Sequence, residues 1–331
     1  MHPFLGTPLR AAELPGLCIA YRTFGSLGSR CPIVLCHGFP ETSFSWRYQV
    51  GALARSGHFV IVPDLRGYGA TGGPDDVEAY DMETICDDIV GLLGKVGSSR
   101  AIIAGHDWGG ALAWNMAMRR PRHVAGVISL CTPFHARSPA DPIAIMRRRF
   151  GEDMYMVHFQ KQGEPDAILD RSPRKTLDYF FRRPSADMNN RGTGISTVPG
   201  AGTSILPIVR EIEAYDPGCD GREHFLSRPE FDHFVSAFEA TGFTRAINWY
   251  RNITRNWETA ASYDGIVQQP ALLLQAEHDR FLPPAAAEGM ECVVPRLERQ
   301  LVRRAGHWLQ QENPNEVTLA MIAWIERHFP E

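Results

Sequence analysis

The sequence has no long apolar run and no excess of positive charge. No segment approaches the roughly 18 consecutive apolar residues that would span a bilayer, and the N-terminus lacks the basic start and apolar stretch of a signal peptide. Its 34 lysines and arginines stand against 38 acidic residues, a net charge of −4. A chain without an excess of basic residues is poorly suited to bind the phosphate backbone of a nucleic acid. We therefore expect neither a membrane nor a nucleic acid among its partners.

Cysteine is sparse, and the seven cysteines are scattered without the paired C-x-x-C spacing of zinc or redox sites. An odd, unpaired set is typical of a reducing compartment, so we predict a cytoplasmic protein. The composition is otherwise ordinary, with 44% hydrophobic and 22% charged residues. A chain of 331 residues therefore buries a sizeable core, as one large domain with an insertion or as two domains.

Short apolar segments alternate with helix-like segments in the first part of the chain and again near its end. Seven segments are typical of strands: Leu17–Arg22, Ile33–Cys36, Phe59–Pro63, Ala101–Ala104, Val124–Leu130, Ala271–Ala276 and Gln300–Arg303. Helices are expected at Met82–Val96, from Pro284 onward, and at Asn315–His328. Continuous apolar strands separated by helices predict an α/β fold with a mostly parallel central sheet.

The middle of the chain differs from the rest in composition and in its pattern of apolar residues. Between residues 135 and 263 arginine is frequent, aromatic residues are dispersed, and the alternation of strands and helices is lost. We predict a core domain of residues 1–134 and 264–331, with a mainly helical cap inserted at residues 135–263. Residues 189–204 are rich in Gly, Ser, Thr and Asn, which predicts a long loop. The run Arg147-Arg148-Arg149 is interpreted as a solvated helix face.

One predicted strand runs into a glycine-rich turn with an acid at its centre. The segment Gly105-His-Asp-Trp-Gly-Gly110 follows the strand and precedes a helix-forming stretch. This is the pattern of a nucleophile elbow, in which small neighbours let strand and helix approach around an exposed nucleophile. Asp107 occupies the position that usually holds serine, and a carboxylate is already ionised at neutral pH. The alternative is that Asp107 only caps the following helix.

The nucleophile indicates the kind of electrophile. An aspartate that attacks a saturated carbon forms an ester, which water can cleave at the carbonyl, whereas serine would form an ether that water does not readily cleave. Asp107 therefore favours attack on the sp3 carbon of an epoxide or an alkyl halide over attack on an ester or amide. This chemistry requires no metal and no organic cofactor.

An acid and a histidine follow Asp107 at later strand ends, in the chain order that this scaffold uses. Asp279 lies after the strand at 271–276, and His307 after the strand ending at 303. Catalytic groups of open α/β sheets gather at such carboxyl ends. His307 would deprotonate a water molecule, and Asp279 would orient the imidazole. Glu277 is the alternative acid.

An earlier turn suits an oxyanion hole. His37-Gly-Phe-Pro40 follows a strand directly, and the main chain must turn there so that an N–H group faces the site. The expected donors are the backbone N–H groups of Phe39 and Trp108. An ordinary strand-ending turn is the simpler alternative for this motif alone.

Together these motifs resemble the α/β-hydrolase superfamily, and specifically the epoxide hydrolases similar to the C-terminal domain of the mammalian soluble enzyme. The resemblance covers nearly the whole chain. It rests on His37-Gly-Phe-Pro40, Asp64-Leu-Arg-Gly-Tyr-Gly69, Gly105-His-Asp-Trp-Gly-Gly110, Gly242-Phe-Thr-Arg-Ala-Ile-Asn-Trp-Tyr-Arg251 and Gly306-His-Trp308. It implies an α/β-hydrolase fold with a cap and two cap tyrosines that donate to the epoxide oxygen. By position these map onto Tyr155 and Tyr250. No such motif surrounds Tyr179, Tyr215 or Tyr263, which are expected to pack or lie at the surface.

Several aromatic residues beside these motifs are candidates for an apolar substrate pocket: Phe39, Trp108, Phe134, Phe159 and Trp308. The expected partners are a small-molecule epoxide and water, and the oligomeric state is left open, with a homodimer as one option.

Two other functions are weighed against the epoxide hydrolase. A dehalogenase would share the aspartate nucleophile, but Phe39 stands where haloalkane dehalogenases usually have Asn, and Trp108 where fluoroacetate dehalogenases commonly have Arg. The two candidate tyrosines also favour the epoxide. A binding protein without turnover is disfavoured because Asp107, Asp279 and His307 are all present.

Overall fold

The central element is a sheet whose order and direction follow the predicted fold class. The computed structural model describes residues 3–28, 30–183 and 206–330. Within these residues the chain forms an eight-stranded sheet in the order β1-β2-β4-β3-β5-β6-β7-β8. The first two neighbouring pairs, β1 with β2 and β2 with β4, are antiparallel, and the later pairs are parallel. The predicted mostly parallel sheet is confirmed.

Strands in the middle of the sheet match the sequence prediction, and strands at its edges do not. The strands are β1 (Arg10–Leu14), β2 (Leu17–Phe24), β3 (Ile33–Cys36), β4 (Val60–Pro63), β5 (Ala101–His106), β6 (Val124–Leu130), β7 (Ala271–Ala276) and β8 (Leu297–Val302). Every residue of β3 to β7 is buried, which produces continuous apolar runs. By contrast, β1 was not predicted and β8 starts three residues before its predicted start. Both are edge strands with mostly exposed or half-exposed residues, so their apolar signal is weak.

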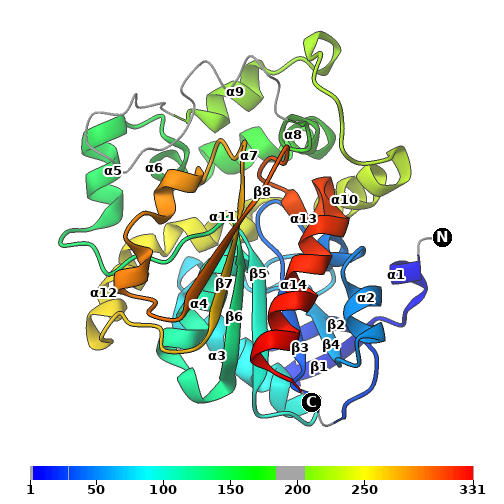
Figure 1. Cartoon of the computed structure of the whole chain (residues 1–331). Helices are drawn as coiled ribbons and strands as arrows, with labels where there is room; N and C mark the ends of the chain where they lie inside the picture. The colour runs from blue at the N-terminus through cyan, green and yellow to red at the C-terminus, as the bar shows by residue number, and fades with distance from the viewer. Residues whose placement is uncertain (1–2, 29, 184–205, 331) are drawn as a thin grey trace.

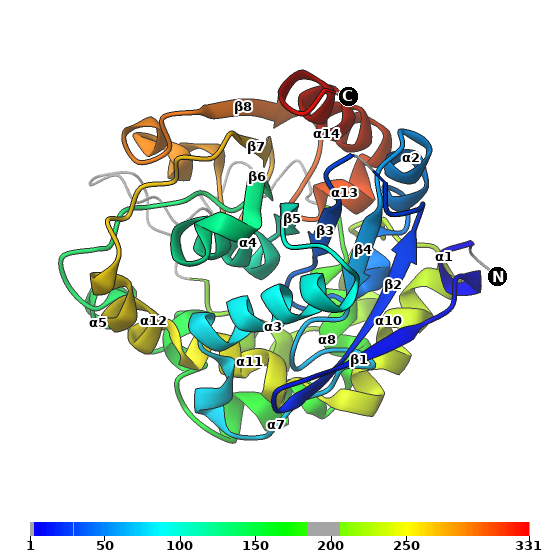
Figure 2. The same ribbon diagram turned by 90° about the horizontal axis from the view of Figure 1, so that it is seen from below.

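Helices cover both faces of the sheet, as Figure 2 shows. On one face lie α3 (Met82–Lys95) and α4 (Trp108–Arg119), and on the other lie α2 (Val50–Arg55) and α14 (Pro314–His328). Short helices occur at α1 (Pro3–Gly6) and α13 (Leu309–Glu312). The helix predicted from Pro284 is wrong: the chain makes a single 3-10 turn at Pro284–Ala287, and Gly289 then adopts a left-handed φ of 77°. Glu288 is already extended, with a ψ of 134°, so the helical conformation ends there and the left-handed Gly289 does not resume it.

Between β6 and β7 the chain forms helices that lie above the sheet and to its side in Figure 1. They are α5 (Pro142–Phe150), α6 (Tyr155–His158), α7 (Glu164–Asp170), α8 (Pro173–Phe180), α9 (Ile208–Ala214), α10 (Arg228–Thr241), α11 (Thr244–Arg251) and α12 (Ile253–Thr259). We refer to this segment as the cap and to the rest as the core. The loop predicted at residues 189–204 falls outside the described residues. Arg147, Arg148 and Arg149 are exposed at the end of α5.

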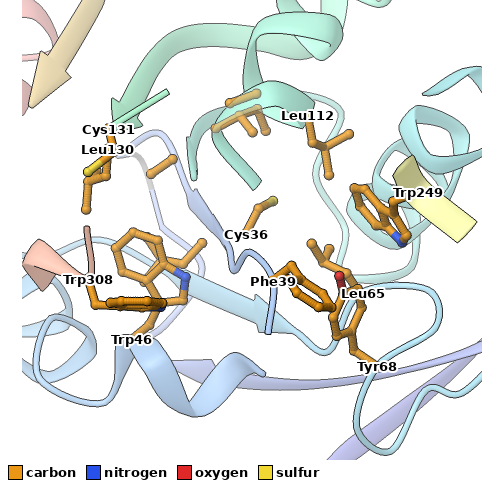
Figure 3. Packing of buried hydrophobic residues seen from close by; sticks show 14 of the residues in the cluster. Cys36, Phe39, Trp46, Leu65, Tyr68, Leu112, Leu130, Cys131, Trp249 and Trp308 are labelled. Carbon is orange, nitrogen blue, oxygen red and sulfur yellow. The ribbon is translucent and has the colours of Figure 1, made fainter. Parts of the chain in front are cut away.

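The cap and the core share one hydrophobic cluster. Trp249 of α11 is completely buried, and its ring centroid lies 6.0 Å from that of Tyr68 in the core. Figure 3 shows Trp249 on the same side of the cluster as Tyr68 and Leu65. The indole N–H of Trp249 also donates to the carbonyl of Arg66 at 2.9 Å. These contacts fix α11, and therefore Tyr250, against the core. Among the helices of the described residues, none is long and apolar enough to cross a membrane.

Candidate active site

Asp107 lies on a strained turn between β5 and α4. Its backbone angles are φ 53° and ψ −118°, a conformation that is costly for a residue with a side chain. A Cβ atom at Gly105 would lie 1.9 Å from the carbonyl oxygen of Gly109, so glycine is required where strand and helix meet. The Asp107 side chain makes no capping bond to α4, which contradicts the capping alternative. The predicted elbow geometry is therefore present.

The Asp107 carboxylate is oriented by the turn after β3. Its Oδ1 atom accepts a hydrogen bond of 2.8 Å from the backbone N–H of Phe39. This approach needs glycine at position 38, because a Cβ there would lie 2.5 Å from the Cβ of Asp107. One carboxylate oxygen is thus held by a predicted oxyanion-hole donor, while Oδ2 points toward His307. Trp108, whose N–H is the second predicted donor, is the first residue of α4.

The three predicted residues of the triad come together at the carboxyl ends of β5, β7 and β8. His307 Nε2 lies 3.6 Å from Asp107 Oδ2, and His307 Nδ1 lies 2.8 Å from Asp279 Oδ2. The other oxygen of Asp279 accepts from the backbone N–H groups of Phe281 and Leu282 at 2.8 and 2.9 Å. The alternative acid, Glu277, instead accepts from the backbone of Arg304. The structure thus places Asp279 beside His307.

These charges stabilise one another. Burial acts to lower the pKa of the His307 imidazole, but the Asp279 and Asp107 carboxylates outweigh it and leave that pKa well above its ordinary value. Burial acts to raise the pKa of Asp279, and His307 more than offsets it, so that pKa lies below its usual value. Nearby opposite charges favour the ionised form of each group. An imidazolium between two carboxylates is therefore the favoured state of the free site.

Tyr155 of α6 and Tyr250 of α11 lie over the same pocket as Asp107 and His307. Their ring centroids are 5.7 Å apart. The Gln160 side chain ties the two helices together, since its Nε2 donates to the carbonyls of Met156 and Tyr250 at 2.8 and 3.0 Å. Burial, with the Asp107 charge as a second cause, raises the pKa of both phenols above the ordinary value. Both therefore stay protonated at neutral pH and can donate hydrogen bonds.

The pocket at Asp107 is small and mostly aromatic. Three of the predicted lining residues, Phe39, Phe159 and Trp308, line it, together with Phe180, Ile208 and Phe281. The last three were missed, and only Phe281 had a sequence signal, because it lies two residues after Asp279. The free volume is about 20 Å³, enough for roughly one water molecule.

The other two predicted lining residues, Trp108 and Phe134, line a separate and much larger cavity. Its volume is about 490 Å³, and its wall is largely apolar, with Ala111, Trp114 and Met118 from α4 among the lining residues. The rings of Trp108 and Tyr250 meet edge to face at 4.9 Å. Trp108 lines the larger cavity and Tyr250 lines the pocket at Asp107, so this contact joins a wall of one to a wall of the other.

A buried pair that the sequence analysis missed lies behind His307. His106 Nδ1 is 2.7 Å from Glu41 Oε2, and His106 Nε2 is 2.7 Å from the backbone carbonyl of His307. The His106 ring therefore bridges the Glu41 carboxylate and the main chain of His307. Burial acts to raise the pKa of Glu41, yet His106 lowers it to about 2.

One group of side chains in the described residues has the spacing of a metal site. One atom each from His106, Cys131 and His307 lie within 4.8 Å of one another. Both nitrogens of His106 are used in hydrogen bonds, and the Cys131 thiol donates to the His307 carbonyl at 3.2 Å. We assign this group to hydrogen bonding around His307.

The other cap and junction tyrosines form hydrogen bonds outside the pocket. The Tyr179 hydroxyl donates to Glu211, the single proton of the Tyr215 hydroxyl is shared between Asp178 and Asp220, and Tyr263 donates to Glu83 at 2.8 Å. These bonds agree with the structural roles expected for the three tyrosines.

Comparison of the sequence and the structure with known proteins identifies the class of protein to which the chain belongs. The model of the α/β-hydrolase fold family matches residues 32–165. Epoxide hydrolase A of Mycobacterium tuberculosis is 38% identical over 298 residues, which cover 88% of this chain and 89% of that protein. Bifunctional epoxide hydrolase 2 of Sus scrofa is 37% identical over 92% of this chain, and the chain spans 53% of that protein's length. The crystal structure of Epoxide Hydrolase A from Mycobacterium thermoresistibile superposes with a TM-score of 0.84, at 35% identity, over 97% of this chain and 98% of that one.

The fold is therefore the α/β-hydrolase fold, with its mostly parallel sheet and its elbow after β5. Within that class, the chain belongs to the epoxide hydrolase family of enzymes. The family resemblance inferred from the sequence motifs is thereby confirmed.

Proposed function

We propose that this enzyme converts an epoxide with a large apolar substituent into a vicinal diol, through an ester formed on Asp107. The observation that carries the proposal is a single pocket that holds a carboxylate nucleophile, a histidine paired with a second carboxylate, and two protonated tyrosines. The tyrosines favour an epoxide over an alkyl halide, because ring opening leaves an alkoxide that needs a proton.

In the first step, Asp107 Oδ2 attacks a ring carbon while Oδ1 stays bound to the Phe39 N–H. The carbon–oxygen bond of the ring breaks, and Tyr155 or Tyr250 gives its phenolic proton to the departing oxygen. Both phenols have raised pKa values, so they are protonated before the step. The product is a hydroxyalkyl ester of Asp107.

In the second step, water cleaves the ester. Esterification removes the negative charge of Asp107, which is one of the two charges that hold the His307 proton, so the imidazolium can pass that proton to the tyrosinate left by ring opening and act as a base. His307 takes a proton from water, the hydroxide adds to the ester carbonyl, and the Phe39 and Trp108 N–H groups stabilise the oxyanion. The diol oxygen leaves and takes that proton from His307. The second proton of the water, left on the Asp107 carboxyl, passes to His307 and restores the imidazolium of the free site.

The larger cavity supports the substrate class. The pocket at Asp107 has room for little more than the reacting atoms, whereas the neighbouring cavity of about 490 Å³ is lined by apolar side chains. An apolar substituent would lie past the Trp108–Tyr250 contact in that cavity. Burial of such a group contributes roughly 25 cal/mol per Å² of apolar surface.

The decisive test compares products from four substrates: styrene oxide, a small aliphatic epoxide, a haloalkane and fluoroacetate. We expect diol from the epoxides, with a lower KM for styrene oxide, and no halide from the others. Asp107→Ala should abolish diol formation, by more than about a thousandfold, because the covalent step is lost. Halide release without diol formation would favour the dehalogenase, and full turnover by Asp107→Ala would overturn the mechanism.

A further inference from the structure

Glu312 is a buried carboxylate next to His307 that the proposed chemistry does not use. It lies at the end of α13, and its side chain is 1% exposed. Its Oε2 atom accepts from the backbone N–H of Gly306 at 2.9 Å, and Oε1 accepts from the backbone N–H of Trp308 at 3.1 Å. These two N–H groups belong to the residues immediately before and after His307. One carboxylate therefore holds the main chain on both sides of the histidine.

An ion pair does not explain why this carboxylate is buried. A buried carboxylate is costly unless a well-placed cation compensates it. The cation that faces Glu312 is Arg183 of the cap, 4.0 Å from Oε2 and 37% exposed. Burial raises the pKa of Glu312, so its bonds to backbone N–H groups and the charges of Arg183 and His307 compensate only part of the burial penalty. The effect of these two bonds is to fix the backbone conformation of residues 306–308.

The opposite side of the same segment is held as well. The His307 carbonyl accepts from His106 Nε2 at 2.7 Å and from the Cys131 thiol at 3.2 Å. With both flanking N–H groups and its own carbonyl bound, the His307 backbone has little freedom to shift. The direction of its ring is then set by the bond from Nδ1 to Asp279. The position of Nε2 relative to Asp107 is therefore determined by the fold.

We propose that Glu312 is a positioning residue for the step in which His307 activates water. This inference rests on the proposed function. In the first step the reacting groups are Asp107 and the two tyrosines, so a small displacement of His307 changes ester formation little. In the second step Nε2 must hold a water molecule against the ester carbonyl, and a displacement of about 1 Å can cost on the order of a hundredfold. Loss of Glu312 should therefore slow ester hydrolysis selectively.

The variants are Glu312→Ala, which removes both acceptors, and Glu312→Gln, which keeps one carbonyl oxygen for one of the two N–H groups. Asp81 offers a matched control. It is a buried carboxylate that accepts from a backbone N–H, of Thr84, and faces a half-exposed cap arginine, Arg255. It lies at the start of α3 and contacts none of the residues at 306–308. Asp81→Ala and Asp81→Asn reproduce the chemical changes away from His307.

The measurement is the fraction of enzyme present as the Asp107 ester during turnover of styrene oxide, by rapid quench and intact-protein mass spectrometry. Circular dichroism monitors folding. We expect Glu312→Ala to lower kcat about tenfold to a hundredfold, with an unchanged rate of ester formation and with most of the enzyme accumulating as the ester. Glu312→Gln should show a smaller effect in the same direction. The Asp81 variants should retain the ester fraction of the unaltered protein.

A purely structural role for Glu312 predicts another result: lower thermal stability with an unchanged ester fraction in the folded protein. That result in Glu312→Gln would overturn the inference even if Glu312→Ala does not fold. An equal slowing of both steps would also overturn it. If the unaltered protein forms no diol and no ester, the proposed function itself fails. Failure of the positioning role alone requires normal diol formation by the unaltered protein.

Discussion

The core and the cap contribute opposite kinds of group to the same pocket. Asp107, Asp279 and His307 come from the carboxyl ends of core strands and carry charges that bond to one another and to backbone N–H groups. Tyr155 and Tyr250 come from cap helices and are neutral donors surrounded by aromatic rings.

The cause of each pKa shift follows this division. At the core, charge interactions outweigh burial, so the pKa of His307 rises and that of Asp279 falls. In the cap, burial is the first cause that raises the pKa of each phenol. Ionised groups are thus stabilised where polar backbone is available, and neutral acids are kept neutral where it is not. In the proposed mechanism, ring opening needs the cap donors in addition to Asp107 of the core, whereas ester hydrolysis needs the core base His307.

The largest effect is expected at the core. His307→Gln removes the base but keeps a side chain of similar polarity, so Asp107 should still form the ester while hydrolysis slows by roughly 10²–10⁴-fold. Mass spectrometry of the peptide that contains Asp107 should show the substrate adduct.

The matched control is His278→Gln, a neighbouring histidine that does not line the pocket at Asp107. This variant should turn over the substrate without accumulating the adduct on Asp107. Diol formation at the normal rate by His307→Gln would contradict the division of steps.

A smaller effect on the other step is expected in the cap. Tyr155→Phe and Tyr250→Phe should each lower kcat/KM by about tenfold to a hundredfold, and the double variant should lose more than either, because one phenol can partly replace the other. No ester should accumulate, since ring opening becomes the slow step. Rapid-quench measurement of ester formation tests this directly.

Tyr179→Phe provides the control for the loss of a buried phenol, because its hydroxyl bonds Glu211 outside the pocket. It should leave kcat/KM unchanged. Accumulation of ester in the Tyr155 or Tyr250 variants would show that the cap serves the second step instead.

The same division decides how much the sequence could predict. Asp107 and Asp279 follow the buried strands β5 and β7, whose continuous apolar runs locate them in the chain. The parallel arrangement brings both to the same edge of the sheet as His307, which follows the edge strand β8. The cap has no such periodic signal, and Tyr155 and Tyr250 were found only through the resemblance to a family. Phe180 and Ile208 were missed because a helix of the cap does not reveal which of its faces meets the pocket.

The polar residues that lie behind the site could not be predicted from the sequence either. Glu41, His106 and Glu312 lie close to His307 because the turn after β3, the end of β5 and the helix α13 converge there. A histidine next to the nucleophile and a glutamate in a short helix have no spacing that distinguishes them from ordinary residues. Their environment, complete burial and specific partners, exists only in the folded chain.

The attachment of the cap to the core can be tested at one indole. Trp249→Phe removes a buried N–H and leaves the Arg66 carbonyl without that donor, which should lower the free energy of unfolding by about 1–3 kcal/mol. Because Tyr250 is the next residue, kcat/KM should fall without ester accumulation. Urea denaturation and rapid quench measure the two effects. Trp257→Phe is the control: its N–H donates to Ser138, at the start of the cap segment. It should cost stability and leave the balance of the two steps unchanged.

The subtlest expected effect concerns the charge that links the two steps. In the free enzyme the Asp107 carboxylate helps to hold the proton of His307, so its removal in Asp107→Ala should lower the pKa of His307, with Asp279 still in place. The direction is fixed by the loss of a negative charge 3.6 Å from Nε2. An NMR titration of the His307 ring in both proteins measures the shift. Asp107→Ala also mimics the ester in carrying no charge, so a lowered pKa would show how alkylation itself converts His307 from an acid into the base of the next step. A pKa that is equal or higher in Asp107→Ala would mean that Asp279 alone sets the charge of the imidazole, and that ester formation does not activate it.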